Sequence, residues 1–370
     1  MPVLPGLDAL PKNADLLAQL HDKRLGLLTN PTGVTRDGAP ALNVLRDLNL
    51  NVVALFSPEH GPRADREGAI ESGQTAEGLP VHSLYGATRR PAPAMLDGLD
   101  AITIDLQDVG ARFYTYASTM FHLLEACAGR NIAVVILDRP NPLGGGCEGP
   151  IIEPDLQSFV GLAPLPITHG MTMAELAFWF IDYAKLDAEI LVSPVEGWSR
   201  DMRWPQTGLP WRRPSPNLPD FTAAAWYAGL CLLEFCDFSV GRGTNAPFQI
   251  LAVPDFRAQE FVARWRNNAI AASVVEVVPT HAKFAGEQCA GVRFEGNLPD
   301  APVHFGLEVM ATLRASHPDW PREDFAKAAQ LVGSRAVMEA LWQHDLATAL
   351  ALTRRDGNAW KAERAPFLIY

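Results

Sequence analysis

Short apolar segments recur along the first half of the chain, and polar residues follow each of them directly. They span residues 24–28, 51–56, 100–104 and 132–137. Runs of this length that are rich in Val, Ile and Leu are typical of buried strands in a parallel sheet. Ligands bind outside the carboxyl ends of such strands in open α/β sheets. Four strands that each end in polar residues therefore predict one shared site.

Helical patterns separate these strands. Residues 113–128 carry apolar side chains at helical spacing, and residues 171–183 form a second predicted helix. Thr172 opens that helix with Glu175 three residues later, which is the pattern of a capping box. A further short strand is predicted at 189–193. The alternation predicts an α/β fold with a mostly parallel sheet covered on both faces.

The pattern changes between Gly197 and Pro219, where Trp and Pro alternate too densely for regular elements. We interpret this segment as an ordered linker or lid. Beyond it the chain predicts a helix at 223–235, strands at 248–254, 272–279 and 291–295, and a mainly helical tail over 302–352. At 370 residues two domains are expected. We place them at 1–205, a catalytic α/β domain, and 206–370, a smaller α+β domain that closes the cleft.

Composition and charge narrow the class of protein. A formal charge of −11 argues against nucleic acid or an anionic membrane as the main partner. The chain has no stretch of eighteen apolar residues, so we expect no transmembrane helix. The first residues lack the features of a signal peptide, which predicts a cytoplasmic protein, or a periplasmic or secreted one if a signal has been removed. Five cysteines without paired spacing indicate neither a disulfide framework nor a zinc site.

The segment Ser57–Arg63 (SPEHGPR) holds the strongest candidate for chemistry. Glu59 sits there directly after a predicted strand, between Pro58 and His60. A partly desolvated carboxyl group keeps its proton near neutral pH, as general acid catalysis requires. A helix cap or a surface ion pair is the alternative interpretation.

Asp105 and Asp108 follow the predicted strand 100–104. Two carboxylates three residues apart can share a site, or one can cap a helix beginning near Arg112. We expect Asp105 near the site and Asp108 as a cap or a supporting group. Together with Glu59 and His60 they are possible metal ligands. They lack any HxH, DxD or HExxH spacing, so we expect no metal.

Four further residues are candidates for binding a ligand. Asn141 lies in the loop 138–146, which suits close approach to ligand hydroxyls but equally a structural turn. His169 precedes a predicted helix and either binds a ligand or caps that helix. Asn217 projects from the Pro-rich segment, and Arg242 lies between two glycines, where a guanidinium can meet an anion or remain solvated. Because the loop is not GxGxxG, we expect no dinucleotide cofactor, nor any other.

Eight segments taken together resemble the exo-β-N-acetylmuramidase family, which is named for the enzyme NamZ. In order along residues 25–250 they are GLLTNPTGVTRDG, LFSPEHGPR, DLQDVGARFYTYASTM, LDRPNPLGG, SFVG, PITHGMTMAELA, PSPNLP and SVGRGTNAPF. The resemblance implies a Rossmann-like N-terminal domain, a smaller C-terminal domain and an active site between them. It also implies hydrolytic removal of N-acetylmuramic acid (MurNAc) from the non-reducing ends of peptidoglycan fragments, as in cell-wall recycling.

The resemblance places the catalytic glutamate on Glu59. The substrate-binding candidates, from the resemblance and from the residues themselves, are Asn30, His60, Arg63, Asp108, Tyr114, Asn141, His169, Asn217 and Arg242. MurNAc carries a lactyl carboxylate, for which Arg63 and Arg242 are the candidates. Tyr114 and one of the tryptophans of the Pro-rich segment are expected to stack on the sugar.

The predicted mechanism has Glu59 protonating the glycosidic oxygen of a small saccharide, MurNAc-GlcNAc or a muropeptide. A second group, for which Asp105 is the candidate, activates water or stabilises the transition state. Substrate assistance by the 2-acetamido group stays open, as do retention and inversion, which carboxyl separation distinguishes. The alternatives are a non-catalytic muropeptide-binding protein and a metal-dependent hydrolase that uses the same cleft.

Overall fold

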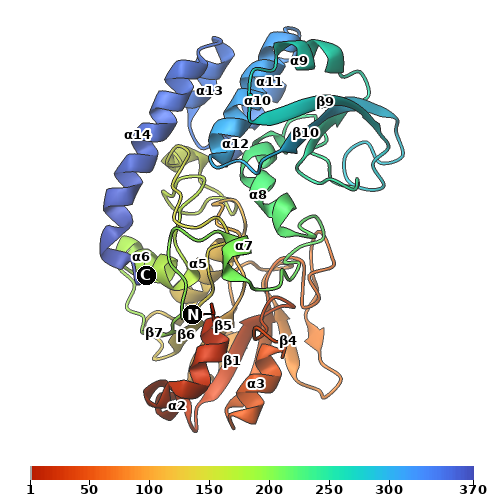
Figure 1. The fold of residues 1–370 in the computed structure, drawn as a ribbon. Coiled ribbons are helices and arrows are strands. Elements are labelled where there is room, and N and C mark those ends of the chain that lie inside the picture. Colours follow the sequence, from red (N-terminus) through yellow and green to blue (C-terminus); the bar gives the residue numbers. More distant parts are fainter. Residues whose placement is uncertain (1) are drawn as a thin grey trace.

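The structure, a computed structural model of the chain, describes residues 2–370. Figure 1 shows a large sheet in the lower part of the molecule and a smaller sheet with several helices above it. The long C-terminal helix runs down one side and joins the two parts. Within residues 2–370, no helix is both long and apolar enough to cross a membrane.

The large sheet has seven strands in the order β3-β4-β2-β1-β5-β6-β7. All neighbouring strands are parallel except β3, which pairs antiparallel with β4 at the edge. The strands are β1 Arg24–Thr29, β2 Asn51–Ser57, β3 Gly73–Gln74, β4 Pro80–Ser83, β5 Ala101–Asp105, β6 Ala133–Leu137 and β7 Ile190–Ser193. The five predicted strands are confirmed. The sequence analysis missed β3 and β4, because neither contains an apolar run.

Apolar side chains of this sheet alternate between two hydrophobic clusters, one on each face. Leu27 and Val135 belong to one cluster, and Leu28 and Ile136, one residue further along each strand, belong to the other. The helices of this part are α1 Gly6–Ala9, α2 Ala14–Leu20, α3 Ala41–Asp47, α4 Pro93–Leu96, α5 Tyr116–Cys127 and α6 Met173–Ala184. The predicted mostly parallel α/β architecture, Rossmann-like in its two covered faces, is confirmed.

Both predicted helices of this part are present, with one change of boundary. α6 begins with the predicted capping box: Glu175 donates its backbone N–H to the Thr172 hydroxyl, and its carboxylate accepts from the Thr172 N–H at 2.9 Å. α5 begins at Tyr116 rather than near Arg112. The preceding residues therefore form a buried loop, which carries Thr115 to the site described below.

The second part contains a three-stranded antiparallel sheet in the order β8-β10-β9. The Pro-rich segment before it is irregular apart from one helical turn, as predicted. The elements are α7 Trp204–Thr207, α8 Phe221–Leu230, β8 Ile250–Val253, α9 Ala258–Arg264, β9 Ile270–Val277, β10 Cys289–Gly296, α10 Pro302–Ser316, α11 Arg322–Lys327, α12 Ala329–Val332, α13 Arg335–Trp342 and α14 Leu346–Arg364. The predicted smaller α+β unit is thus present. The boundary near residue 205 stays a prediction.

Buried hydrogen bonds fix the two parts to each other. The Trp360 indole of α14 donates to the carbonyl of His169 at 2.8 Å, and the Tyr370 hydroxyl donates to Asp138 at 2.9 Å. One hydrophobic cluster also runs without a break from the large sheet into α8, α10 and α14. The space between the two parts is therefore bounded by fixed walls.

Candidate active site

A cavity of about 460 Å³ lies where the loops after β2 and β4 meet the loop before α5 and the α8 end of the second part. This volume is in the range of small-molecule sites. The residues that line it and that the argument uses are Glu59, His60, Glu67, Tyr85, Arg89, Phe113, Tyr114, Thr115, Phe159, Asn217, Tyr227, Glu234, Arg242 and Phe248. It combines carboxylates, arginines and aromatic rings.

A larger hollow of about 730 Å³ lies on α11–α13 and shares Phe235 and Gln330 with this cavity. Its cations are already paired: Lys327 with Asp324 at 2.9 Å, Arg335 with Asp155 at 2.5 Å and Arg322 with Glu339 at 2.7 Å. It also lies away from the strand ends. We therefore take the smaller cavity as the candidate active site.

Glu59 is half-buried in the wall of this cavity, two residues after the end of β2. The Thr115 hydroxyl donates to its Oε2 at 2.5 Å. The Tyr85 hydroxyl lies close to the same carboxylate, and burial together with this charge raises the pKa of Tyr85 to about 12. His60 adopts a left-handed conformation with φ of 70°, which turns the chain directly after Glu59. The expected placement of Glu59 and His60 beside the cleft is supported by this geometry.

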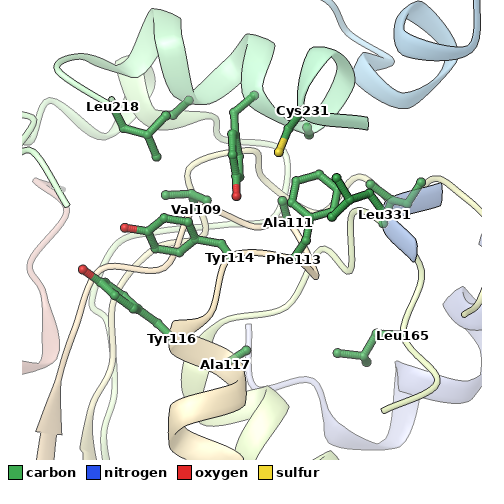
Figure 2. Close-up of a cluster of buried hydrophobic side chains, with 14 of the residues drawn as sticks. Val109, Ala111, Phe113, Tyr114, Tyr116, Ala117, Leu165, Leu218, Cys231 and Leu331 are labelled. Atoms are coloured by element: carbon green, nitrogen blue, oxygen red, sulfur yellow. The ribbon is translucent and has the colours of Figure 1, made fainter. Parts of the chain in front are cut away.

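Aromatic rings from both parts of the molecule form the floor of the cavity. Phe113 and Tyr114 come from the loop before α5, and Tyr227 comes from α8. Tyr114 meets the Tyr116 ring edge-on at 4.6 Å between centroids, and Tyr227 meets Phe113 in the same way at 5.1 Å. In Figure 2, Phe113 and Tyr114 lie below Leu218 and Cys231, which belong to the opposite wall. Tyr114 thus lies in the cavity wall, although its side chain is largely buried, and its stacking on a sugar stays a prediction.

The tryptophans of the Pro-rich segment do not supply the expected stacking surface. Trp204 packs edge-on against Trp211 at 5.1 Å, and Trp198 against Tyr370 at 5.5 Å. None of the three lines the cavity within the described residues 2–370. Their rings are used in packing, and the aromatic surface of the site comes from tyrosines and phenylalanines instead.

Arg242 lines the cavity, as expected, but its charge is already balanced. Its guanidinium lies 2.7 Å from Glu234 and 3.4 Å from Glu67. Burial disfavours its charge, but Glu234 and its neighbours outweigh this and the pKa of Arg242 is raised. Arg63, the other candidate for the lactyl carboxylate, is exposed, pairs with Asp65 at 2.9 Å and does not line the cavity.

Asn217 also reaches the cavity from the Pro-rich segment, as predicted. Its amide nitrogen donates to Glu67 at 2.5 Å, and its oxygen lies 3.3 Å from Nε2 of His281. Asn217 thus fixes one of the two carboxylates around Arg242.

Asp105 is fully enclosed and lies outside the cavity lining. Its Oδ1 accepts a hydrogen bond from Nε of Arg139 at 2.5 Å. Burial raises the pKa of Asp105, and Arg139 opposes that shift. The geometry thus gives Asp105 a structural partner and no access to a ligand. Among residues 2–370, no group of three or more His, Cys, Asp or Glu is placed to hold a metal ion.

Asn30 and Asp108 also face inward rather than into the cavity. The Asn30 amide donates to the Tyr116 hydroxyl at 2.5 Å, and its oxygen accepts from the Thr32 N–H at 2.9 Å. Asp108 accepts from the Gly110 N–H at 2.7 Å, which closes a tight turn. The expected helix cap at Asp108 is absent, because α5 begins several residues later.

His169 and Asn141 both form hydrogen bonds to the backbone of Met171, in a buried region just before α6. Nδ1 of His169 accepts from the Met171 N–H at 3.2 Å, while its Nε2 lies 3.4 Å from Asp108. Asn141 accepts from the Leu143 N–H at 2.9 Å and donates to the Met171 carbonyl at 3.0 Å. Both residues are buried and neither lines the cavity. The structure therefore favours the turn interpretation of Asn141, whereas His169 does not cap α6, whose N-cap is Thr172.

Besides the aromatic residues Phe113, Phe159, Tyr227 and Phe248, five of the lining residues named above were not candidates in the sequence analysis. They are Glu67, Tyr85, Arg89, Thr115 and Glu234. Thr115 was within reach, because it follows Tyr114 in a segment already singled out. Tyr85 and Arg89 follow β4, which no pattern predicted. Glu67 and Glu234 carry no local signal that distinguishes them from solvated charges.

The cavity thus combines a half-buried carboxyl group with aromatic rings, between a Rossmann-like sheet and a second α+β unit, and such a site can bind a sugar ring and protonate a leaving group. Sequence profiles described as the N-terminal and C-terminal parts of the exo-beta-N-acetylmuramidase NamZ match residues 25–222 and 225–370. The chain belongs to this family of glycosidases, as the ordered segments predicted.

Known proteins are similar to this chain in sequence and in structure over most of its length. The peptidoglycan beta-N-acetylmuramidase NamZ of Bacillus subtilis (strain 168) is 38% identical over 327 residues, which are 86% of this chain and 78% of that protein. Two crystal structures of DUF1343 family proteins from Bacteroides fragilis each cover 100% of this chain and 99% of their own, with TM-scores of 0.90 and 0.79 at 30% and 29% identity.

Proposed function

We propose that the cavity binds the terminal MurNAc of a peptidoglycan fragment and that Glu59 protonates the glycosidic oxygen as the bond breaks. The observation that carries this proposal is the position of Glu59, half-buried in the wall of an aromatic cavity in a chain of this family. Aromatic rings suit the faces of a sugar, and partial burial suits an acid catalyst. The reaction is the exo-acting hydrolysis that releases MurNAc from the non-reducing end, which serves cell-wall turnover.

The charges in the cavity favour a mechanism with a single carboxyl group. Glu67 and Glu234 are both tied to Arg242, and Asp105 lies outside the lining. Glu59 is the remaining carboxyl group of the lining, and it has no cationic partner among residues 2–370. We therefore favour substrate assistance, in which the 2-acetamido oxygen attacks C1 while Glu59 protonates the departing oxygen. Water then opens the cyclic intermediate as Glu59 takes back a proton.

The test is release of MurNAc from a MurNAc-GlcNAc disaccharide by the wild type and by Glu59→Gln, both with EDTA present. We expect the wild type to release the sugar and Glu59→Gln to fall by on the order of 10² or more, the range for a lost general acid. Glu71→Gln is the control, because Glu71 is exposed and outside the cavity lining. Melting temperatures of all three proteins separate loss of chemistry from loss of folding.

The other interpretations make different predictions in the same experiment. A muropeptide-binding protein without activity binds the disaccharide and releases no sugar. Its Glu59→Gln variant has the same affinity for the disaccharide as the wild type. A metal-dependent hydrolase loses its activity when EDTA is added. Activity that survives EDTA and disappears in Glu59→Gln contradicts both.

A further inference from the structure

Arg89 is a cation in the cavity that has no counter-ion. It lies on the loop after β4, and its guanidinium carbon is 4.4 Å from the centre of the Phe159 ring and 5.1 Å from that of Tyr85. Within the described part of the chain, residues 2–370, no acidic side chain comes within ion-pair distance of it. Two aromatic faces thus hold the guanidinium by cation–π contact.

The neighbouring arginines differ from Arg89 in this respect. Arg242 shares the cavity but is held by Glu234 and Glu67. Arg90 follows Arg89 directly in the chain, is ion-paired with Glu125, and lies outside the cavity lining. A guanidinium stacked on rings keeps its N–H edge free, and that edge matches the two oxygens of a carboxylate.

Tyr85 connects Arg89 with the proposed acid. Its hydroxyl lies close to Glu59, while its ring carries the guanidinium of Arg89. A single MurNAc ring bears one group for each of these two residues. The glycosidic oxygen on C1 suits Glu59, and the lactyl ether on C3 carries a carboxylate that suits Arg89. N-acetylglucosamine has a plain hydroxyl in place of that ether.

We propose that Arg89 binds the lactyl carboxylate of MurNAc and thereby selects this sugar over N-acetylglucosamine. The inference rests on the proposed function and adds the residue that recognises the lactyl carboxylate of the substrate. Because the Arg89 side chain is exposed, a carboxylate bound there lies at the mouth of the cavity. A stem peptide attached to the lactyl group would continue into solvent, but its amide would lack the charge that Arg89 recognises. The enzyme therefore prefers peptide-free MurNAc ends.

The test compares MurNAc-GlcNAc with the same disaccharide whose lactyl carboxylate is a methyl ester. We expect the wild type to have a higher kcat/KM for the free acid, by roughly 10- to 100-fold, the range for a hydrogen-bonded charge. Arg89→Met should abolish this preference, mainly by raising KM for the free acid. Arg89→Lys, which keeps the charge but loses the fork, should be intermediate.

Arg90→Met is the matched control and should keep the wild-type preference for the free acid. If Arg89→Met also keeps that preference, the inference is overturned. If the wild type cleaves neither disaccharide, the proposed function fails, yet Arg89 can still be tested by the binding of MurNAc and its methyl ester. A preference in binding that Arg89→Met leaves intact would again overturn the inference.

Discussion

Thr115 donates a hydrogen bond of 2.5 Å to Oε2 of Glu59, and this contact joins the loop before α5 to the loop after β2. The two residues come from different strand–helix connections, so the bond fixes the carboxyl group relative to the aromatic floor of the cavity. Thr115 is thus a positioning residue for the proposed acid rather than a part of the chemistry.

Replacing Thr115 by Val should lower kcat by roughly 10- to 100-fold, because Glu59 becomes a carboxylate as it gives up its proton, and a hydrogen bond to a charged group contributes about 1.5–3 kcal/mol. KM and the melting temperature should change little, since Val fills the same space. Thr115→Ser keeps the hydroxyl and should restore most of the activity. Steady-state kinetics on MurNAc-GlcNAc checks this, and equal kcat values for the Val and Ser variants would contradict the positioning role.

Replacing Asp105 by Asn should reduce stability rather than catalysis. Asp105 is fully enclosed against Arg139, and removing one partner of a buried ion pair typically costs about 3–5 kcal/mol. We expect a clear drop in melting temperature and a kcat near that of the wild type for the protein that remains folded. If kcat instead falls by on the order of 10² at an unchanged melting temperature, Asp105 would be the second catalytic group.

The sequence predicted most of the large sheet, because its strands are dense runs of Val, Ile and Leu that no helix period explains. The start of α6 was equally clear, since Thr172 and Glu175 form a capping box through local contacts alone. The edge strand β4 gave no such signal: it begins with Pro80 and is only partly buried. Tyr85 and Arg89, which follow it, were therefore missed.

The strand-end rule found the correct edge of the sheet but too many ligand candidates. Asn30, Asp105, Asp108 and Asn141 all lie at or after strand ends, yet their polar atoms form hydrogen bonds within their own turns or with other buried residues. Buried polar groups need hydrogen-bond partners, so the loops at a sheet edge contain polar side chains whether or not a ligand binds there. Sequence cannot separate these two uses, because they require the same residue types. Glu59 differs in that it stays half-buried in the cavity wall.

Arg112 connects the two parts of the molecule through hydrogen bonds to backbone carbonyls of both. Its buried guanidinium donates to the carbonyls of Pro150, Leu165, Leu331 and Val332, at 2.6–3.2 Å. Burial without an acidic partner lowers the pKa of Arg112 to about 9. Arg112→Met leaves several buried acceptors unpaired, at roughly 1–3 kcal/mol each. We expect a fall in melting temperature of roughly 5–15 °C by calorimetry. The exposed Arg355→Met is the control, and an equal effect in both would contradict the role of Arg112.

Glu148 should make stability depend on pH. Its carboxylate accepts from the Val303 N–H at 3.1 Å and lies 3.8 Å from His304, and burial raises its pKa to about 7, against 4.5 when unfolded. Because the folded state holds the proton more tightly, Glu148 contributes stability that is complete below pH 4.5 and is lost as pH rises through 7. The loss is on the order of 3 kcal/mol.

Glu148→Gln mimics the protonated side chain and still accepts from Val303, so it should remove this loss. We expect the variant to melt at a higher temperature than the wild type at pH 8 and at a similar temperature at pH 4.5. Differential scanning calorimetry between these pH values checks the difference. Glu323→Gln is the control, because Glu323 is exposed on α11 and should leave the curve unchanged. A Glu148→Gln curve parallel to that of the wild type would show that another group governs the pH dependence. His304 cannot be that group, because burial lowers its pKa, and a histidine of this kind makes stability rise rather than fall with pH.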